Sequence, residues 1–215
     1  MNGAPLTSPE ASRNPVAGRR IRMMSLLLCT LAVYVGAGGL TACSQKDGGT
    51  GSVASSVPVA QSVELLSKEG RGFTAGSMMT ANTVYVLFDP QCPHCGHLWE
   101  QSQPLQRKVK FVWMPVAFIG AQSAPQGAAL LTAPDPVAAM TAHEASLLAG
   151  NGGTAASSSI PDDIAAAIRT NTDLFKRLGG ESVPYIVARN QRTGEVVNYA
   201  GAMETAALAQ FLGID

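Results

Sequence analysis

The sequence predicts an α/β fold, in which helices cover a central sheet. Short runs of β-branched, aliphatic and aromatic residues, typical of buried strands, alternate with longer Ala-rich or amphipathic stretches typical of helices. The chain has 215 residues, 46% of them hydrophobic, which is enough for one domain with a buried core. Lys plus Arg and Asp plus Glu number 15 each, so neither a nucleic-acid surface nor an acidic tail is indicated.

The elements become distinct from residue 83. The run TVYVLF (83–88) predicts a buried strand, which Asp-Pro-Gln ends. A helix is expected over 92–103, because Pro93 suits the first helical position and Pro104 ends or kinks the helix. The run VKFVWMPVAF (109–118) predicts a second buried strand.

The second half of the chain continues the alternation. Two Ala-rich stretches predict helices over 125–133 and 135–149, and 161–178 predicts a third, with aspartates at its positive N-terminal end. A short helical patch is expected over 62–70, ahead of the first strand. The last expected elements are strands over 185–189 and 196–201 and a helix over 203–212.

The N-terminal segment has the pattern of a bacterial export signal. Three arginines in GRRIRMM precede the apolar run MMSLLLCTLAVYVGAGGL, and LTAC follows. The order Leu-x-Ala-Cys resembles the bacterial lipobox, which implies cleavage before Cys43 and lipid attachment to its sulfur. Ser44 in the next position implies sorting to the outer membrane. The alternative is an uncleaved membrane anchor, since the run is close to the ~18 residues of a membrane-spanning helix.

Three parts of the chain are therefore expected. Residues 1–42 form the signal segment, the Gly/Ser-rich residues 43–61 form a flexible tether, and residues 62–215 form the folded domain. The tether has a root-mean-square reach of about 25 Å. After export and lipidation, the domain keeps two cysteines, and a structural disulfide that closes so short a loop gains little entropy.

These two residues, Cys92 and Cys95, are interpreted as a redox pair. A structural zinc site needs four ligands, but no cysteine follows, and His94 and His97 lie on the same helical turn as the thiols. Covalent haem attachment needs C-x-x-C-H, and Gly96 stands in the histidine position.

The expected helix start suits thiol chemistry. Unpaired N–H groups and the positive dipole end favour the thiolate of Cys92, which is expected to be the exposed attacking sulfur. Cys95, one turn later and facing inward, can close the disulfide. Pro93 fixes the turn, and His94 can stabilise the anion through its ring N–H or its charge. The other two histidines are expected to be surface or packing residues.

The segment FDPQCPHCGHLW resembles the active-site segment of the bacterial periplasmic thiol:disulfide interchange proteins, the DsbC/DsbG group most closely. The likeness covers residues 82–213 and includes the stretches MPVAFIGAQSAPQGAALLTAPDPVAAMTAHEA and NTDLFKRLGGESVPYIVA. It implies a thioredoxin fold with a helical insertion between the second and third core strands. It also implies site roles: Cys92 as nucleophile, Cys95 as resolving thiol, Pro93 and His94 as tuning residues, and Val183-Pro184 as a cis-proline loop that binds the substrate backbone.

Three departures from this group bear on its activity. The Pro-His dipeptide and Val183 before the proline resemble the oxidant DsbA rather than the isomerases, which implies an oxidising pair. The stretch between Cys43 and Thr83 is too short for the group's dimerisation domain, so a monomer is expected. Val86 occupies the place of thioredoxin's buried acid, six residues before the first cysteine, which disfavours a thioredoxin-like reductase.

The predicted function is that of a lipid-anchored periplasmic thiol–disulfide oxidoreductase acting on substrate proteins that contain cysteines. No metal or cofactor beyond the redox-active disulfide is expected, and a membrane redox partner must recycle it. Alternatives remain open: a DsbG-like reductase of oxidised cysteines, a non-catalytic assembly lipoprotein that uses the fold for binding, or a copper chaperone with His94 or His97 as a ligand.

Overall fold

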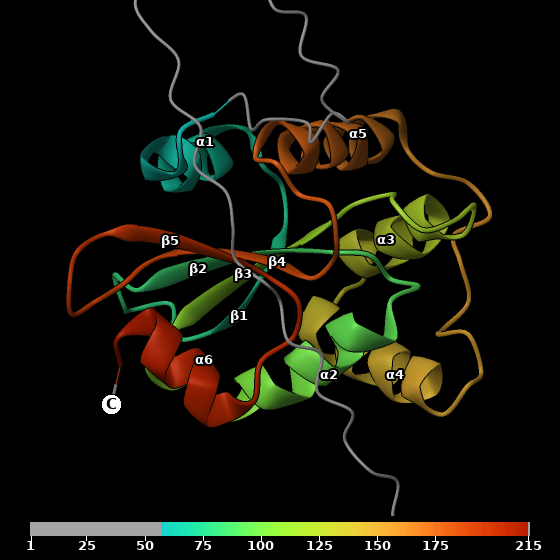
Figure 1. Cartoon of the computed structure of the whole chain (residues 1–215). Coiled ribbons are helices and arrows are strands. Elements are labelled where there is room, and N and C mark those ends of the chain that lie inside the picture. The colour runs from blue at the N-terminus through green and yellow to red at the C-terminus, as the bar shows by residue number, and fades with distance from the viewer. Residues whose placement is uncertain (1–56, 215) are drawn as a thin grey trace, which may run out of the picture. The chain divides into compact units, whose positions relative to one another are not determined.

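The computed structural model describes residues 57–214, which contain a five-stranded mixed sheet with helices on both faces (Figure 1). The strand order is β1-β3-β2-β4-β5. β2 and β3 are parallel, and every other neighbouring pair is antiparallel. The strands are β1 (Phe73–Gly76), β2 (Thr83–Phe88), β3 (Lys110–Pro115), β4 (Tyr185–Arg189) and β5 (Val196–Ala200).

Six α-helices and two short 3-10 helices surround the sheet in the described part of the chain. In Figure 1, α1 and α5 lie on one face of the sheet and α2, α4 and α6 on the other. α3 packs against both α4 and α5. The helices are η1 (Val59–Gln61), α1 (Ser62–Glu69), α2 (Pro93–Ser102), η2 (Gln103–Leu105), α3 (Ser123–Thr132), α4 (Pro136–Leu148), α5 (Asp162–Arg177) and α6 (Thr205–Leu212).

The sequence pattern predicted every strand and α-helix from β2 to α6, with small shifts at the ends, but not η2. It missed β1, whose four residues lie between glycines and pair with β3, with Phe73 opposite Trp113. The tether was expected to reach residue 61, but Val59–Gln61 form η1 and Val57 packs against the core. The predicted signal, the lipidation site Cys43 and the rest of the tether lie outside the described residues.

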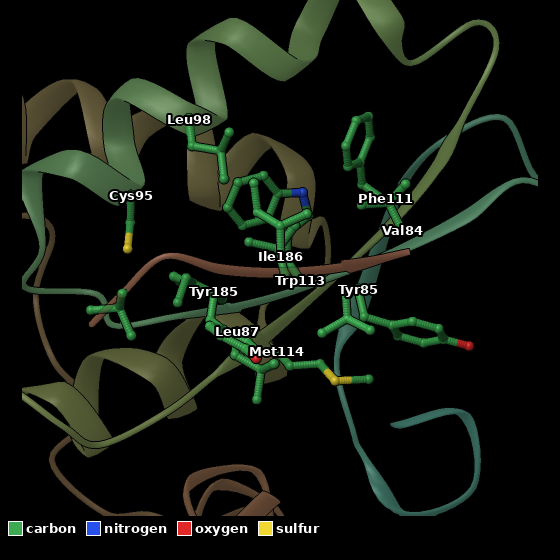
Figure 2. Close-up of a cluster of buried hydrophobic side chains, with 14 of the residues drawn as sticks. Val84, Tyr85, Leu87, Cys95, Leu98, Phe111, Trp113, Met114, Tyr185 and Ile186 are labelled. Carbon is green, nitrogen blue, oxygen red and sulfur yellow. The ribbon is translucent and has the colours of Figure 1, made fainter. Parts of the chain in front are cut away.

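Aromatic rings join α2 to the central strands β2 and β3. β2 is buried along nearly its whole length, as its unbroken apolar run predicted. The Trp99 ring of α2 meets the Trp113 ring of β3 edge to face, with ring centres 5.1 Å apart, and Trp113 also contacts Phe88. Figure 2 shows Cys95 and Leu98 pointing from α2 toward the sheet. This packing fixes the first turn of α2 against the end of β2.

Within residues 57–214, no helix is long and apolar enough to cross a membrane.

Candidate active site

The turn between β2 and α2 is held by a buried carboxylate. Asp89 follows the last residue of β2, and one of its side-chain oxygens accepts a hydrogen bond from Gln91 N at 2.9 Å. The other accepts from Phe118 N at 2.7 Å and Ile119 N at 2.8 Å, in the loop after β3. Cys92 N donates to the Asp89 carbonyl at 3.0 Å. Sequence analysis assigned Asp89 only to a strand-breaking turn and missed its role in tying two loops together.

Cys92 is the N-cap of α2, with Pro93 at the first helical position. Its extended backbone (φ −98°, ψ 110°) lets its carbonyl accept from Cys95 N at 2.9 Å. Both cysteines are free thiols. The pair therefore lies where the chain passes from strand β2 into helix α2, as predicted.

The expectation that Cys92 would be openly exposed is wrong, since only 5% of this residue is exposed. The segment that contains the Val183–Pro184 bond lies against it, and the Cys92 thiol donates to the Val183 carbonyl at 3.5 Å. That peptide bond is cis, as predicted. Cys95 is completely buried, so Cys92 is the one residue of the pair with any exposure.

The two thiols ionise very differently. A hydrogen bond from the Cys95 thiol, helped by the backbone N–H groups of Cys95 and His94 and by the His94 charge, lowers the pKa of Cys92 from 9.0 to about 6 against the effect of burial. Burial and the neighbouring Cys92 raise the pKa of Cys95 well above its usual value. Three pKa units correspond to about 4 kcal/mol in favour of the Cys92 thiolate. The site thus separates a reactive sulfur from a protected one.

The three histidines occupy different environments. His94 and His97 are exposed on α2, with ring centres 6.4 Å apart. His143 is buried on α4 and bonds to the Pro90 carbonyl at 2.7 Å through Nε2. Because Thr154 N donates to Nδ1, Nε2 carries the proton, and burial lowers the pKa of the ring and keeps it neutral. His143 is therefore a packing residue, as expected, and it joins α4 to the active-site turn.

Sequence analysis missed Glu144, the next residue on α4. It is 1% exposed, and neither carboxylate oxygen has a hydrogen-bond partner among the described residues. A Cβ added to Gly96 would lie 2.8 Å from Glu144 Oε2, so the carboxylate lies against α2 directly after Cys95. Burial, the Cys92 charge and the Glu100 charge raise the pKa of Glu144 to about 8. A single acid in a helix made mostly of apolar residues was the available signal.

Cation ligands are sparse in the part of the chain that the structure describes, where no three His, Cys, Asp or Glu side chains cluster to hold a metal ion.

Comparison with known proteins supplies the fold. No family model matches the chain. Its sequence is 29% identical over 159 residues to the thiol:disulfide interchange protein DsbG of Pseudomonas aeruginosa, covering 73% of this chain and 60% of DsbG. The structure is similar to the catalytic domain of Proteus mirabilis ScsC, with TM-score 0.56, 18% identity, and coverage of 71% of this chain and 94% of that domain. The chain has the thioredoxin fold.

A second solved structure with a similar fold is that of the thiol-disulfide exchange protein α-DsbA2 from Wolbachia pipientis. It aligns with TM-score 0.55 and 15% identity over 72% of this chain and 94% of its own. In this thioredoxin fold, α3 and α4 form the expected helical insertion between the core strands β3 and β4. Because α4 carries His143 and Glu144, the insertion contributes directly to the surroundings of the cysteine pair.

Proposed function

We propose that the protein is an exported thiol–disulfide oxidoreductase that exchanges a Cys92–Cys95 disulfide with the thiols of substrate proteins. The observation that carries this proposal is the contrast within the pair. Cys92 has a pKa of about 6, whereas Cys95 is buried and holds its proton. At pH 7, one unit above its pKa, about 90% of reduced Cys92 is thiolate, the form that attacks and leaves in disulfide exchange.

In the oxidising direction, a substrate thiolate attacks Cys92 Sγ of the disulfide. The Cys92–Cys95 bond breaks, and its electron pair leaves with Cys95, which takes up a proton. A second substrate thiolate then attacks the substrate sulfur of the mixed disulfide and expels the Cys92 thiolate. In the reducing direction, Cys95 attacks Cys92 instead and releases the substrate as a thiolate. Val183 and Pro184, which lie against the sulfur, would bind the substrate backbone.

The lowered pKa of Cys92 supports the oxidising direction. At pH 7 the thiolate outweighs the thiol about tenfold, which stabilises the reduced protein by about 1.4 kcal/mol, or roughly 30 mV for this two-electron couple. The Pro-His dipeptide points the same way. The similarity to DsbG supports the reducing direction as a second candidate.

The proposed setting is the periplasm, with lipid on Cys43 anchoring the chain to the outer membrane. The signal-like segment and the LTAC sequence support this part of the proposal. Substrate proteins with cysteines and a membrane redox partner that recycles the pair are the proposed partners.

The test uses the full-length chain and a reduced, unfolded substrate protein with two cysteines. The oxidised protein should remove the substrate thiols, and Cys92→Ser should abolish this activity. Cys95→Ser, offered the same substrate protein in its disulfide form, should trap a mixed disulfide at Cys92, which mass spectrometry of the peptide identifies. Equilibration with glutathione buffers then gives the direction of the reaction. If the oxidised native chain left the substrate thiols unchanged, a binding protein without exchange chemistry would be favoured.

A further inference from the structure

The buried carboxylate of Glu144 receives no hydrogen bond from the described residues that would offset the cost of its burial. Both oxygens are buried without a hydrogen-bond partner among the described residues. Such a group destabilises a folded protein, and native structures keep few of them away from functional sites. Its position against Gly96 places it beside the peptide unit that joins Cys95 to the rest of α2.

The ionisable groups that face Glu144 all come from α2. The charge of Glu144 acts on Cys95, and Glu144 itself feels the charges of Cys92 and Glu100. The two histidines of α2 are exposed, and His143 of α4 bonds to the active-site turn instead. The segments α3 and β1 also pack on α4 but carry no ionisable side chain. Glu144 and the two thiols therefore form one electrostatically coupled group.

A groove between α2 and α4 opens to solvent beside Glu144. Glu144 lines it together with Trp99, Gln103 and Thr141, and the exposed Glu100 lies at the same groove. Glu144 thus meets the surface at a groove whose lining residues do not include Cys92. Cys95, completely buried, has no direct contact with solvent.

We propose that Glu144 is the proton acceptor and donor for Cys95 during disulfide exchange. This inference rests on the exchange function proposed above. When Cys95 resolves a mixed disulfide, its proton passes to Glu144, and the Cys95 thiolate attacks Cys92 Sγ. The Cys92–Cys95 bond forms, the bond between Cys92 and the substrate breaks, and the electron pair leaves on the substrate sulfur. Glu144 then gives the proton to solvent through the groove.

The same residue serves the opposite direction. When a substrate thiolate opens the disulfide, Cys95 leaves with the electron pair, and protonated Glu144 supplies the proton. The raised pKa of Glu144, about 8, suits both steps, because the carboxyl is present in both protonation states near neutral pH. An ordinary exposed carboxyl, with a pKa of 4.5, would almost never hold a proton there.

The test separates the two chemical steps with glutathione disulfide and the full-length chain. In a Cys95→Ser background, formation of the glutathione mixed disulfide reports attack by Cys92 alone. With Cys95 present, acid quenching and mass spectrometry of the peptide report how fast Cys95 releases glutathione. Glu144→Gln should leave the attack rate within about twofold. It should slow the release at least tenfold and remove the rise of release with pH that accompanies the ionisation of Glu144.

If Glu144 acted only through its charge, Glu144→Gln would have the opposite effect on the rate of the release step. Removing a negative charge lowers the pKa of Cys95 and should make release as fast as in the native chain, or faster. Such a result, with normal attack by Cys92, would overturn the role of Glu144 and leave the exchange function standing. If the native chain formed no mixed disulfide at Cys92, both proposals would fail together.

Two further variants complete the design. Glu195→Gln, an exposed acid in the turn before β5, is the matched control and should change neither step. Glu100→Gln removes one charge that raises the pKa of Glu144, so the pH midpoint of release should move downward without loss of the step. If Glu144→Gln does not fold, an unmoved midpoint in Glu100→Gln overturns the inference.

Discussion

Replacing Glu144 with Gln should stabilise the folded protein, and the gain should grow with pH. Burial raises the pKa of this carboxyl from 4.5 to about 8, so the folded state holds the proton more tightly than the unfolded state. The stability that this protonated form supplies is complete below pH 4.5 and is lost progressively up to pH 8. At about 1.4 kcal/mol per unit, the loss is under 1 kcal/mol at pH 5 and about 4 kcal/mol at pH 7.5.

Urea unfolding of the native chain and of Glu144→Gln at these two pH values measures the effect. The difference between their free energies of unfolding should grow by about 3 kcal/mol from pH 5 to pH 7.5. In the disulfide form the growth should be smaller but still present, because burial, the largest cause of the raised pKa, remains when the Cys92 charge is gone. An equal difference at both pH values would mean that the carboxyl ionises as it does in water, and the reasoning would be refuted.

Three other outcomes are expected. The thiolate absorbance of reduced Cys92 should titrate with a midpoint near 6, and His94→Gln should raise it because the histidine charge is lost; a native midpoint near 9 would contradict this. Asp89→Ala should lower the free energy of unfolding by about 2–4 kcal/mol in urea, because three N–H groups lose their acceptor; an unchanged midpoint of unfolding would argue against that network. Gly96→Ala should lower the free energy of unfolding by about 1–3 kcal/mol, since the added methyl meets Glu144 Oε2 at 2.8 Å and Leu148 Cγ at 3.1 Å. Thermal unfolding checks this prediction, and a stabilised variant would contradict it.

The elements that the sequence predicted well are those with a strong local pattern. β2 is a run of six apolar and β-branched residues, and α5 carries acids in its first turn and bases in its last. β1 has neither feature. Its four residues include Thr74 and end at Gly76, and they form a strand only because β3 offers an antiparallel edge. Pairing between distant segments leaves no trace in a local window.

The same distinction applies to the site. The cysteine pair, its helix start and the Val183–Pro184 bond follow from short motifs, and the structure has them as predicted. The burial of Cys92 cannot be predicted from such motifs, because the segment that covers this residue is 91 residues away in the chain. Asp89 was likewise assigned only to a turn, because the two backbone N–H groups after β3 that donate to its side chain are about 30 residues further along the chain.

The comparison with thioredoxin at position 86 alone is a weak guide to where a buried acid lies in this protein. Val86 lies in the middle of β2, between β3 and β4, where a carboxylate would be enclosed by Trp113 and Ile186 in the neighbouring strands. Glu144 instead lies on α4, against Gly96 next to Cys95 and at a groove that opens to solvent. A proton acceptor for a buried thiol must lie near that thiol and exchange with water. In the role proposed for Glu144, the helical insertion would supply such a group, which a valine on the strand does not exclude.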